Sequence, residues 1–339
     1  MDWNSKKVLV TGGASFVGSH LVDELIRRGA NKIRVVDNLS SGKLQNIQRY
    51  ISDGKVFFHG DDLLSPGVAQ KMVMDMDVVF HLAADHGGRG YVDLHPAACA
   101  TNLALDGILI KAAYEEGVEK FVFASSGCVY PNHLQTDPKQ VLYLTEDMVG
   151  PPYDSDNTYG WAKLMAEVTL RAYYKDYGMK SASCRLFTVY GPRGIENHAI
   201  MAMIARAFIK QDPYEVWGTG EQVRNWTYVE DTVRGIILAA EKIDDGSAVN
   251  IGTSERITVK DAVREIMNYT EHHAEIRLLP DMPTGPYNRV ADNTLAKELL
   301  GWEPGSSFVE GLHKTIDWYW NAHSVEKVNQ TLELKLTER

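Results

Sequence analysis

Tyr159 and Lys163, spaced i, i+4, are the first residues of this chain whose types and spacing suggest chemistry. They lie in Tyr159-Gly160-Trp161-Ala162-Lys163, a segment that is predicted to be helical. The spacing puts the phenol and the ammonium on one helical face, about 5–6 Å apart at Cβ. A nearby positive charge favours phenolate and lowers a tyrosine pKa from about 10 toward neutral pH. The pair therefore predicts a general base for a substrate hydroxyl, although a solvated helix face has the same pattern.

A hydroxyl and a thiol precede this helix in Ser125-Ser126-Gly127-Cys128, directly after the apolar run 120–124. The run is predicted to be a strand, so Ser126 and Cys128 lie at its carboxyl end. Ligands of a parallel sheet gather at that edge. We therefore expect these side chains to face the same crevice as the Tyr-Lys helix.

The elements that must position these residues begin with the strand, turn and helix predicted for residues 8–27. The turn contains Gly12, Gly13, Ser15 and Gly18, and a helix N-terminus in this position can hold a pyrophosphate. Ser15 stands where the middle glycine of a dinucleotide fingerprint is expected. The next strand ends at Asp37, which is placed to accept hydrogen bonds from the adenosine ribose and to repel a 2′-phosphate. These features predict NAD rather than NADP; a structural βαβ unit with incidental glycines is the alternative.

Strand–helix alternation continues along the chain, with apolar runs at 56–60, 77–84, 120–124 and 181–187. This alternation predicts an α/β fold with a doubly wound parallel sheet, the Rossmann fold. Strand carboxyl ends should then bring together Asp62, Ala83, Ser126 and Phe187.

Prolines punctuate the pattern after about residue 190. We expect a dinucleotide-binding domain over residues 1–190 and a smaller α/β substrate lobe over 191–320, with some chain crossing back to the sheet. Residues 321–339 are polar, with Leu332, Leu334 and Leu336 alternating, and are predicted to be a terminal strand or a frayed tail.

The composition of the 339 residues fits a soluble enzyme: 44% are hydrophobic, and no apolar run approaches the roughly 18 residues of a membrane span. A net charge of −10 argues against a nucleic-acid or anionic-membrane partner. The first strand follows Lys6-Lys7 directly, leaving no room for a signal peptide. The three cysteines have unrelated spacings, which predicts a reducing, cytoplasmic location without disulfides. No metal-ligand pattern is present.

Four motifs together resemble the extended short-chain dehydrogenase/reductases, and within them the nucleotide-sugar epimerases and dehydratases. They are the turn at 11–18, His81-Leu82-Ala83-Ala84, the Ser-Ser and Tyr-x-x-x-Lys pair, and Tyr190-Gly191-Pro192-Arg193. The resemblance covers about residues 6–320. It implies an NAD-dependent isomerase acting on a GDP- or UDP-hexose that is bound mainly by the second lobe. It also implies a homodimer through the Tyr159 helix, unless the apolar stripe Leu164, Val168 and Tyr173 is core.

Cys128 is similar in context to the GDP-mannose 3,5-epimerases, as is the loop Ala84-Asp85-His86-Gly87-Gly88-Arg89-Gly90. If Tyr159 takes the C4 hydroxyl proton while hydride leaves C4, the resulting ketone acidifies the C3 and C5 protons. A thiolate at ring level can remove one of them, since free cysteine titrates near 8.5. The alternative is that Cys128 is a small buried hydrophobe.

The loop after Tyr190 departs from that family because it is shorter and holds no lysine to serve as the opposing acid. His198 is the candidate acid, since histidine titrates near 6.5. The short loop also predicts a roomier pocket. Thr188 is similar to a residue of UDP-glucuronate 4-epimerases, so a 4-epimerase that transfers only hydride stays open. A 4-keto-sugar reductase, a nucleotide sensor, and a 4,6-dehydratase, whose Asp-Glu pair is replaced by Gly127-Cys128, are less favoured.

The resemblance implies a full set of site residues. The catalytic candidates are Tyr159, Lys163, Ser126, Cys128 and His198. NAD is expected to contact Gly12, Ser15, Phe16, Val17, Gly18, Asp37, Asn38, Asp62, Leu63, Leu82, Ala83, Ala84, Asn102, Ser125, Tyr159 and Lys163. The nucleotide sugar is expected to contact His86, Gly87, Gly88, Arg89, Thr188, Asn197, His198, Trp217, Arg224 and Arg289. Arg224 and Arg289 are expected to bind the diphosphate, since guanidinium forks suit phosphate oxygens. His81 is expected to be structural.

Overall fold

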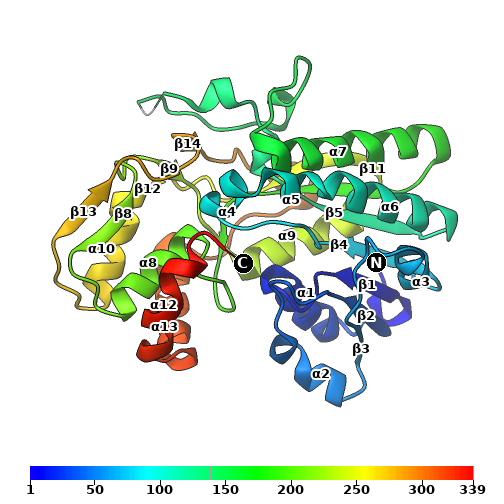
Figure 1. Cartoon of the computed structure of the whole chain (residues 1–339). Coiled ribbons are helices and arrows are strands. Elements are labelled where there is room, and N and C mark those ends of the chain that lie inside the picture. The colour runs from blue at the N-terminus through cyan, green and yellow to red at the C-terminus, as the bar shows by residue number, and fades with distance from the viewer. Residues whose placement is uncertain (138, 339) are drawn as a thin grey trace.

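Seven parallel strands form the central sheet of the computed structural model, which describes residues 1–137 and 139–338 (Figure 1). The strand order is β11-β6-β5-β4-β1-β2-β3. The doubly wound parallel α/β sheet predicted from the sequence is confirmed. The strands are β1 (Lys7–Thr11), β2 (Lys32–Val36), β3 (Val56–His59), β4 (Val78–His81), β5 (Lys120–Ser126), β6 (Ser181–Leu186) and β11 (Asp245–Ile251).

Helices cover both faces of this sheet because each presents an apolar stripe to it. On one face, Leu21 and Leu25 of α1 (Phe16–Arg27) share a core with Ile236 of α9 (Val229–Lys242) and with α11 (Thr294–Leu300). On the other face lie α3 (Val68–Val73), α6 (Asn102–Glu115) and α7 (Asn157–Tyr177). The short helices α2 (Gln48–Ser52), α4 (Arg89–Leu94) and α5 (Pro96–Ala100) lie in the connections.

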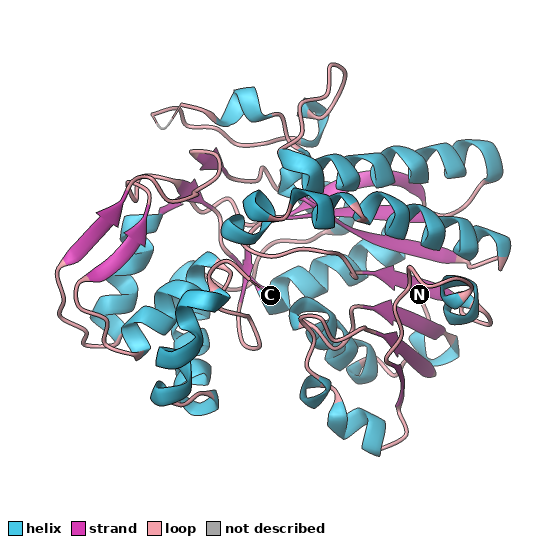
Figure 2. Cartoon of the chain, in the orientation of Figure 1, coloured by secondary structure: helices cyan, strands magenta, loops and turns pink. Residues whose placement is uncertain are grey.

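A second lobe has its own core, built from residues between Tyr190 and Leu336. Its helices lie against short strands (Figure 2), while α9, β11 and α11 return to the main sheet. The elements of the second lobe are β7 (Val189–Tyr190), α8 (Ala199–Phe208), β8 (Tyr214–Trp217), β9 (Val223–Arg224), β10 (Thr227–Tyr228), β12 (Ile257–Thr258), α10 (Val259–Tyr269), β13 (Ile276–Leu279), β14 (Asn288–Arg289), α12 (Phe308–Ala322) and α13 (Val325–Lys335).

The prediction of a terminal strand or frayed tail is wrong, because most of residues 321–339 form α13. Ser324 caps this helix by accepting a hydrogen bond from the Lys327 amide. Val328, Leu332 and Leu336 are buried, whereas Leu334 is 67% exposed. The buried residues follow the i, i+4 spacing of a helix, which the alternating leucines concealed.

The apolar stripe considered for a dimer contact on α7 is core instead. Leu164 is buried in a cluster that Val168 also contacts, and Tyr173 packs against the cluster beneath α6. The exposed apolar side chains of α7 include Trp161 and Met165. No helix of the described residues combines the length and apolarity that a membrane span requires.

Candidate active site

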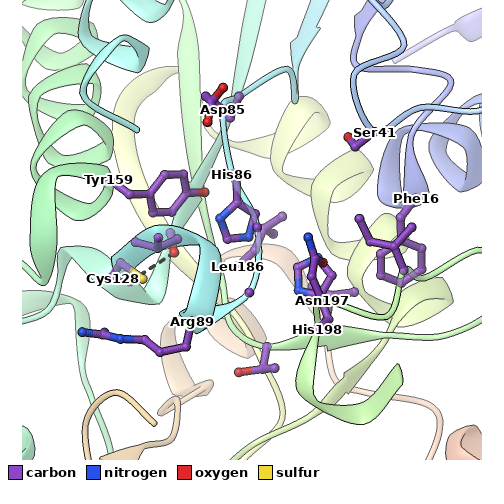
Figure 3. A pocket seen from close by; sticks show the side chains of 18 of the residues that line it. Phe16, Ser41, Asp85, His86, Arg89, Cys128, Tyr159, Leu186, Asn197 and His198 are labelled. Carbon is purple, nitrogen blue, oxygen red and sulfur yellow. Dashed lines mark hydrogen bonds between the residues drawn. The ribbon is translucent and has the colours of Figure 1, made fainter. Parts of the chain in front are cut away.

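A cavity of about 590 Å³ follows the carboxyl ends of the sheet strands and continues into the second lobe. Every site residue predicted from the sequence lines this cavity except Asn102. In Figure 3, Tyr159, His86 and Cys128 gather on one side, whereas Phe16 and Ser41 lie at the opposite end. The topology therefore brings the predicted cofactor and substrate residues to one continuous site.

The glycine turn at the start of α1 is shaped for close backbone packing. Gly12 has φ +68°, and a Cβ there would lie 3.0 Å from the Ala83 amide nitrogen. A Cβ on Gly18 would lie 2.1 Å from the Gly12 carbonyl oxygen. Only glycine fits these two positions, so the N-terminus of α1 can approach a ligand closely.

Asp37 directly follows β2 beside this turn, where it accepts hydrogen bonds from the Ala14 amide (3.0 Å), the Ser15 hydroxyl (3.1 Å) and the Leu39 amide (2.9 Å). These bonds fix its carboxylate at the rim of the cavity. The turn and the acid together fit a dinucleotide, which they would hold by its pyrophosphate and its adenosine ribose.

Two buried polar residues, His81 and Asn102, hold the backbone and side chains next to the cavity in place and have no role in the chemistry. The His81 ring bonds the Thr11 hydroxyl at 2.8 Å and the Asp106 carboxylate at 2.9 Å, as expected of a structural residue. Asn102 accepts from the Asp85 amide at 2.7 Å and donates to the Asp85 carbonyl at 2.9 Å. Asn102 thus fixes the backbone of the sugar loop, which we define as residues 84–90, without lining the cavity.

Tyr159 and Lys163 lie in the predicted relation, but their environment differs from the prediction. The Lys163 ammonium is 5.7 Å from the Tyr159 ring centre and 4.5 Å from that of Phe123. Burial raises the pKa of Tyr159 well above 10, with Cys128 acting in the same direction. Burial also lowers the pKa of Lys163. The expected depression of the tyrosine pKa is therefore absent from the protein alone, because removing both groups from water opposes their charged forms.

Cys128 lies in a short 3-10 turn, Gly127–Val129, between β5 and the start of α7. Its amide donates to the Ser126 hydroxyl at 3.1 Å, which orients the turn. Arg289 Nη1 donates to its sulfur at 3.2 Å. Helix α7 packs tightly here, since a Cβ on Gly160 would lie 2.4 Å from the Cys128 carbonyl oxygen. The Ser126 hydroxyl and the Arg289 guanidinium thus fix the position of this thiol.

Asp156 joins two arginines at the floor of the cavity. It accepts from Arg89 Nη1 at 3.0 and 3.1 Å and from Arg289 Nη2 at 3.0 Å. Burial alone would raise the pKa of Asp156, but Arg289 and Arg89 outweigh it and lower that pKa. Arg289 was predicted to bind a diphosphate; in the structure its guanidinium is engaged by Asp156, Cys128 and Gln135.

Arg224 remains near the substrate space, donating to the Thr284 carbonyl at 2.8 Å and to its neighbour Val223. Burial and the nearby Arg289 and Arg89 lower its pKa to about 9. The resulting cluster holds three arginines, Arg89, Arg224 and Arg289, against the carboxylates of Asp156 and Asp93. This excess of positive charge suits an anionic ligand.

One histidine ring lies against the tyrosine, and a second lies beside the first. The His86 ring stacks on Tyr159, with 4.6 Å between ring centres, and the His198 ring centre is 5.5 Å from that of His86. Burial lowers the pKa of His198 to about 4. The ordinary pKa assumed for His198 as an acid is therefore wrong, because this side chain is neutral at pH 7.

Several residues that line the cavity were not predicted from the sequence, among them Asp156, Arg206 and Leu336. Arg206 is 3% exposed, and within residues 1–137 and 139–338 its Nε and Nη2 atoms have no hydrogen-bond partner. No motif identifies them, although the isolated charge of Arg206 on the apolar helix α8 is a signal. The described residues contain no group of metal ligands.

The model of the NAD dependent epimerase/dehydratase family matches residues 8–252. The chain is 30% identical to GDP-mannose 3,5-epimerase 1 of Oryza sativa subsp. indica, covering 96% of this chain and 84% of that protein. It is similar to the structure of Thermotoga maritima UDP-glucose 4-epimerase with UDP-glucose (32% identity, TM-score 0.82, 92% and 98% of the two chains). It is also similar to the structure of Bacillus cereus UDP-glucuronic acid 4-epimerase in complex with UDP-glucuronic acid and NAD (28% identity, TM-score 0.83, 95% and 99% of the two chains).

Proposed function

The chain belongs to the NAD-dependent epimerase/dehydratase family, and we propose that it inverts C3 or C5 of a nucleotide-linked hexose through a transient 4-ketone, as a GDP-mannose 3,5-epimerase does. One observation carries this proposal: the Cys128 sulfur lines the cavity beside Tyr159 and accepts a hydrogen bond from Arg289. A buried packing cysteine would have neither feature.

The reaction begins at the C4 hydroxyl, whose proton passes to Tyr159. NAD, held by the turn before α1 and by Asp37, would accept the C4 hydride and supply the positive charge that the protein alone does not give the phenol. The 4-ketone makes the C3 and C5 protons acidic, and Cys128 is the base that removes one of them. Arg289 holds that sulfur, while the Lys163 ammonium lies 5.7 Å from the Tyr159 ring centre. Return of the hydride to C4, and of the proton from Tyr159 to its oxygen, would complete the cycle.

Inversion also requires a proton donor on the opposite ring face. No lysine is present in residues 191–198, and the neutral His198 is a poor acid. His86, whose ring stacks on Tyr159, is better placed to return the proton. The His198 ring beside it supplies a polar wall for the sugar.

The nucleotide diphosphate extends from the sugar into the second lobe. Arg224 contributes positive charge there, and Arg206 offers a buried guanidinium whose Nε and Nη2 have no hydrogen-bond partner among the residues that the structure describes. A buried charge without a partner is costly, so an acceptor from the ligand would relieve it. These residues support a GDP- or UDP-sugar as the substrate class.

A UDP-sugar 4-epimerase is the second candidate. Thr188 lines the cavity, the lysine expected opposite Cys128 is absent, and UDP-sugar 4-epimerases are among the similar structures. In this reaction the ketone rotates and hydride returns to its other face. Cys128 would then take no part in catalysis.

We also propose a homodimer, because α6 and α7 pack side by side and expose apolar side chains. Leu103 and Ile108 on α6 are 49% and 39% exposed, and Trp161 and Met165 on α7 are 43% and 46% exposed. Light scattering should give twice the chain mass, and Trp161→Glu should shift it to one chain mass. A monomeric wild type would refute this contact.

The decisive comparison uses wild type, Cys128→Ala and the control Cys184→Ala with GDP-mannose, UDP-glucose and UDP-glucuronate. Cys184 is buried in the sheet and does not line the cavity. Loss of a catalytic base costs about 10²- to 10⁴-fold in rate, so C3 or C5 inversion should fall by that factor only in Cys128→Ala. Full activity of Cys128→Ala on the substrate that wild type turns over would refute the 3,5-epimerase.

A further inference from the structure

Residues 336–338, here called the closing segment, lie against the sugar loop although they are far from it in the sequence. Figure 1 shows the chain leaving α13 and ending beside α4, at the junction of the two lobes. Leu336 is 5% exposed and lines the cavity. A Cβ on Gly90 would lie 2.9 Å from the Leu336 carbonyl oxygen and 3.3 Å from the Trp217 ring. The sugar loop is thus shaped to receive this segment.

Polar contacts tie the closing segment to both sides of the cavity. On the side of the first domain, His95 Nε2 lies 3.3 Å from the Glu338 carboxylate. On the side of the second lobe, Asn197 Nδ2 donates to the Glu338 carbonyl at 3.4 Å. His95 directly follows α4, and Asn197 precedes α8, so the segment contacts both lobes.

The helix before the segment has separate anchors. Val328 and Leu332 are buried in the core of the second lobe. Lys335 pairs with the buried Glu196 carboxylate at 3.1 Å, which also accepts from the Tyr319 hydroxyl at 2.9 Å. Removal of the residues after Lys335 therefore leaves the anchors at Val328, Leu332 and Lys335 in place, and takes Leu336 out of the core.

We propose that the closing segment forms one wall of the sugar pocket and retains the ketone intermediate until hydride returns. This inference rests on the proposed function. In that reaction C4 loses a hydride to NAD and its hydroxyl proton to Tyr159, so a ketone that escapes leaves NADH on the protein. Asn197, in the short loop after Tyr190, and Leu336 both line the cavity, and Asn197 bonds the closing segment. Closure of an active site also keeps water from a reactive intermediate.

The test compares the NAD-bound full chain with a chain that ends after Lys335. Leu336→Ala is the point variant, and Leu334→Ala is its matched control because that side chain is 67% exposed. The closing segment is in equilibrium between the docked position seen here and an undocked one. Loss of the buried leucine should shift this equilibrium toward the undocked position by about tenfold or more. The shortened chain and Leu336→Ala should accumulate NADH, lose activity during turnover and release a ketone that borodeuteride traps. Leu334→Ala should match wild type.

Gly90→Ala tests the same contact from the opposite side. In the full chain its methyl group displaces the closing segment and should reproduce the loss of retention. In the shortened chain the same substitution should add little, because the two changes remove one shared contact. Additive effects in this pair would overturn the proposal, as would a shortened chain that retains NAD and its intermediate like wild type.

Hydrogen exchange separates this inference from the proposed reaction. Amides of the sugar loop should exchange about tenfold faster in the NAD-bound shortened chain than in the full chain, with Leu334→Ala unchanged. Equal exchange would overturn the proposal even if no nucleotide sugar is turned over. If the wild type shows no turnover but the sugar loop exchanges faster in the shortened chain than in the full chain, the proposed reaction is refuted. The closing segment would then still be supported as one wall of the pocket.

Discussion

Replacement of Asp156 by asparagine is the sharpest test of how the floor of the active site is held together. The substitution keeps the shape of the side chain but removes the charge that faces Arg89 and Arg289. The side chain of Asp156 is 6% exposed and that of Arg289 is 10% exposed, whereas that of Arg89 is 31% exposed. The two arginines then lie beside an amide whose NH₂ group repels one of them.

The magnitude follows from this burial. Removing one partner of a buried ion pair costs about 3–5 kcal/mol, and the partial exposure of Arg89 favours the lower limit. For a chain of this length the unfolding entropy is roughly 0.7 kcal/mol/K, so a loss of about 3 kcal/mol lowers Tm by about 4 °C. Asp93→Asn is the control, because Asp93 also binds Arg89 but is 31% exposed, and it should lower Tm by less than about 1 °C.

The pH dependence of the difference in Tm between wild type and Asp156→Asn is an independent test of this ion pair. Because the folded-state pKa of Asp156 is lowered, its contribution is fully present above the unfolded pKa of about 4 and is lost as the pH falls through the folded pKa. Calorimetry should therefore find the difference in Tm between wild type and Asp156→Asn at pH 7, and a smaller difference below about pH 4. An equal Tm at pH 7, or a difference that grows toward acid pH, would refute the account of this network.

Further outcomes follow from the same site. Tyr159→Phe should abolish turnover, by at least about 10²-fold in a discontinuous NMR assay, while NAD binding persists; residual activity near wild type would exclude Tyr159 as the base. Asp37→Asn removes the charge that repels a 2′-phosphate, and should shift the ratio of NADP to NAD affinity roughly tenfold toward NADP by calorimetry; an unchanged ratio would contradict its role. His198→Asn should leave the pH–rate profile between about pH 5.5 and 8 unchanged, because a pKa of about 4 keeps the imidazole neutral there; loss of a limb of that profile would show that His198 titrates.

Local sequence signals predicted the cofactor half of the molecule well. Gly12 and Gly18 lie in the turn after β1, and Asp37 follows the adjacent strand β2. Their spacing in the sequence is therefore enough to predict that they lie side by side. The fold, the family and NAD are confirmed. The cavity also gathers the predicted substrate residues, although their individual roles remain predictions.

Tertiary contacts account for what the sequence did not reveal. Arg289 and Cys128 are separated by 161 residues, and only the folded chain shows that the predicted phosphate ligand lies against the thiol. Burial determines the pKa values of Tyr159 and His198, and burial is not local. Leu336 was assigned to a tail because its helical spacing with Leu332 competed with an apparent alternation.

The central claim is tested most directly by incubating the enzyme with GDP-mannose, UDP-glucose and UDP-glucuronate in deuterated water and following the sugar ring by NMR. The account predicts deuterium at C3 or C5, and its loss in Cys128→Ala. Inversion at C4 without deuterium would contradict the account, and would make Cys128 a packing residue in a 4-epimerase.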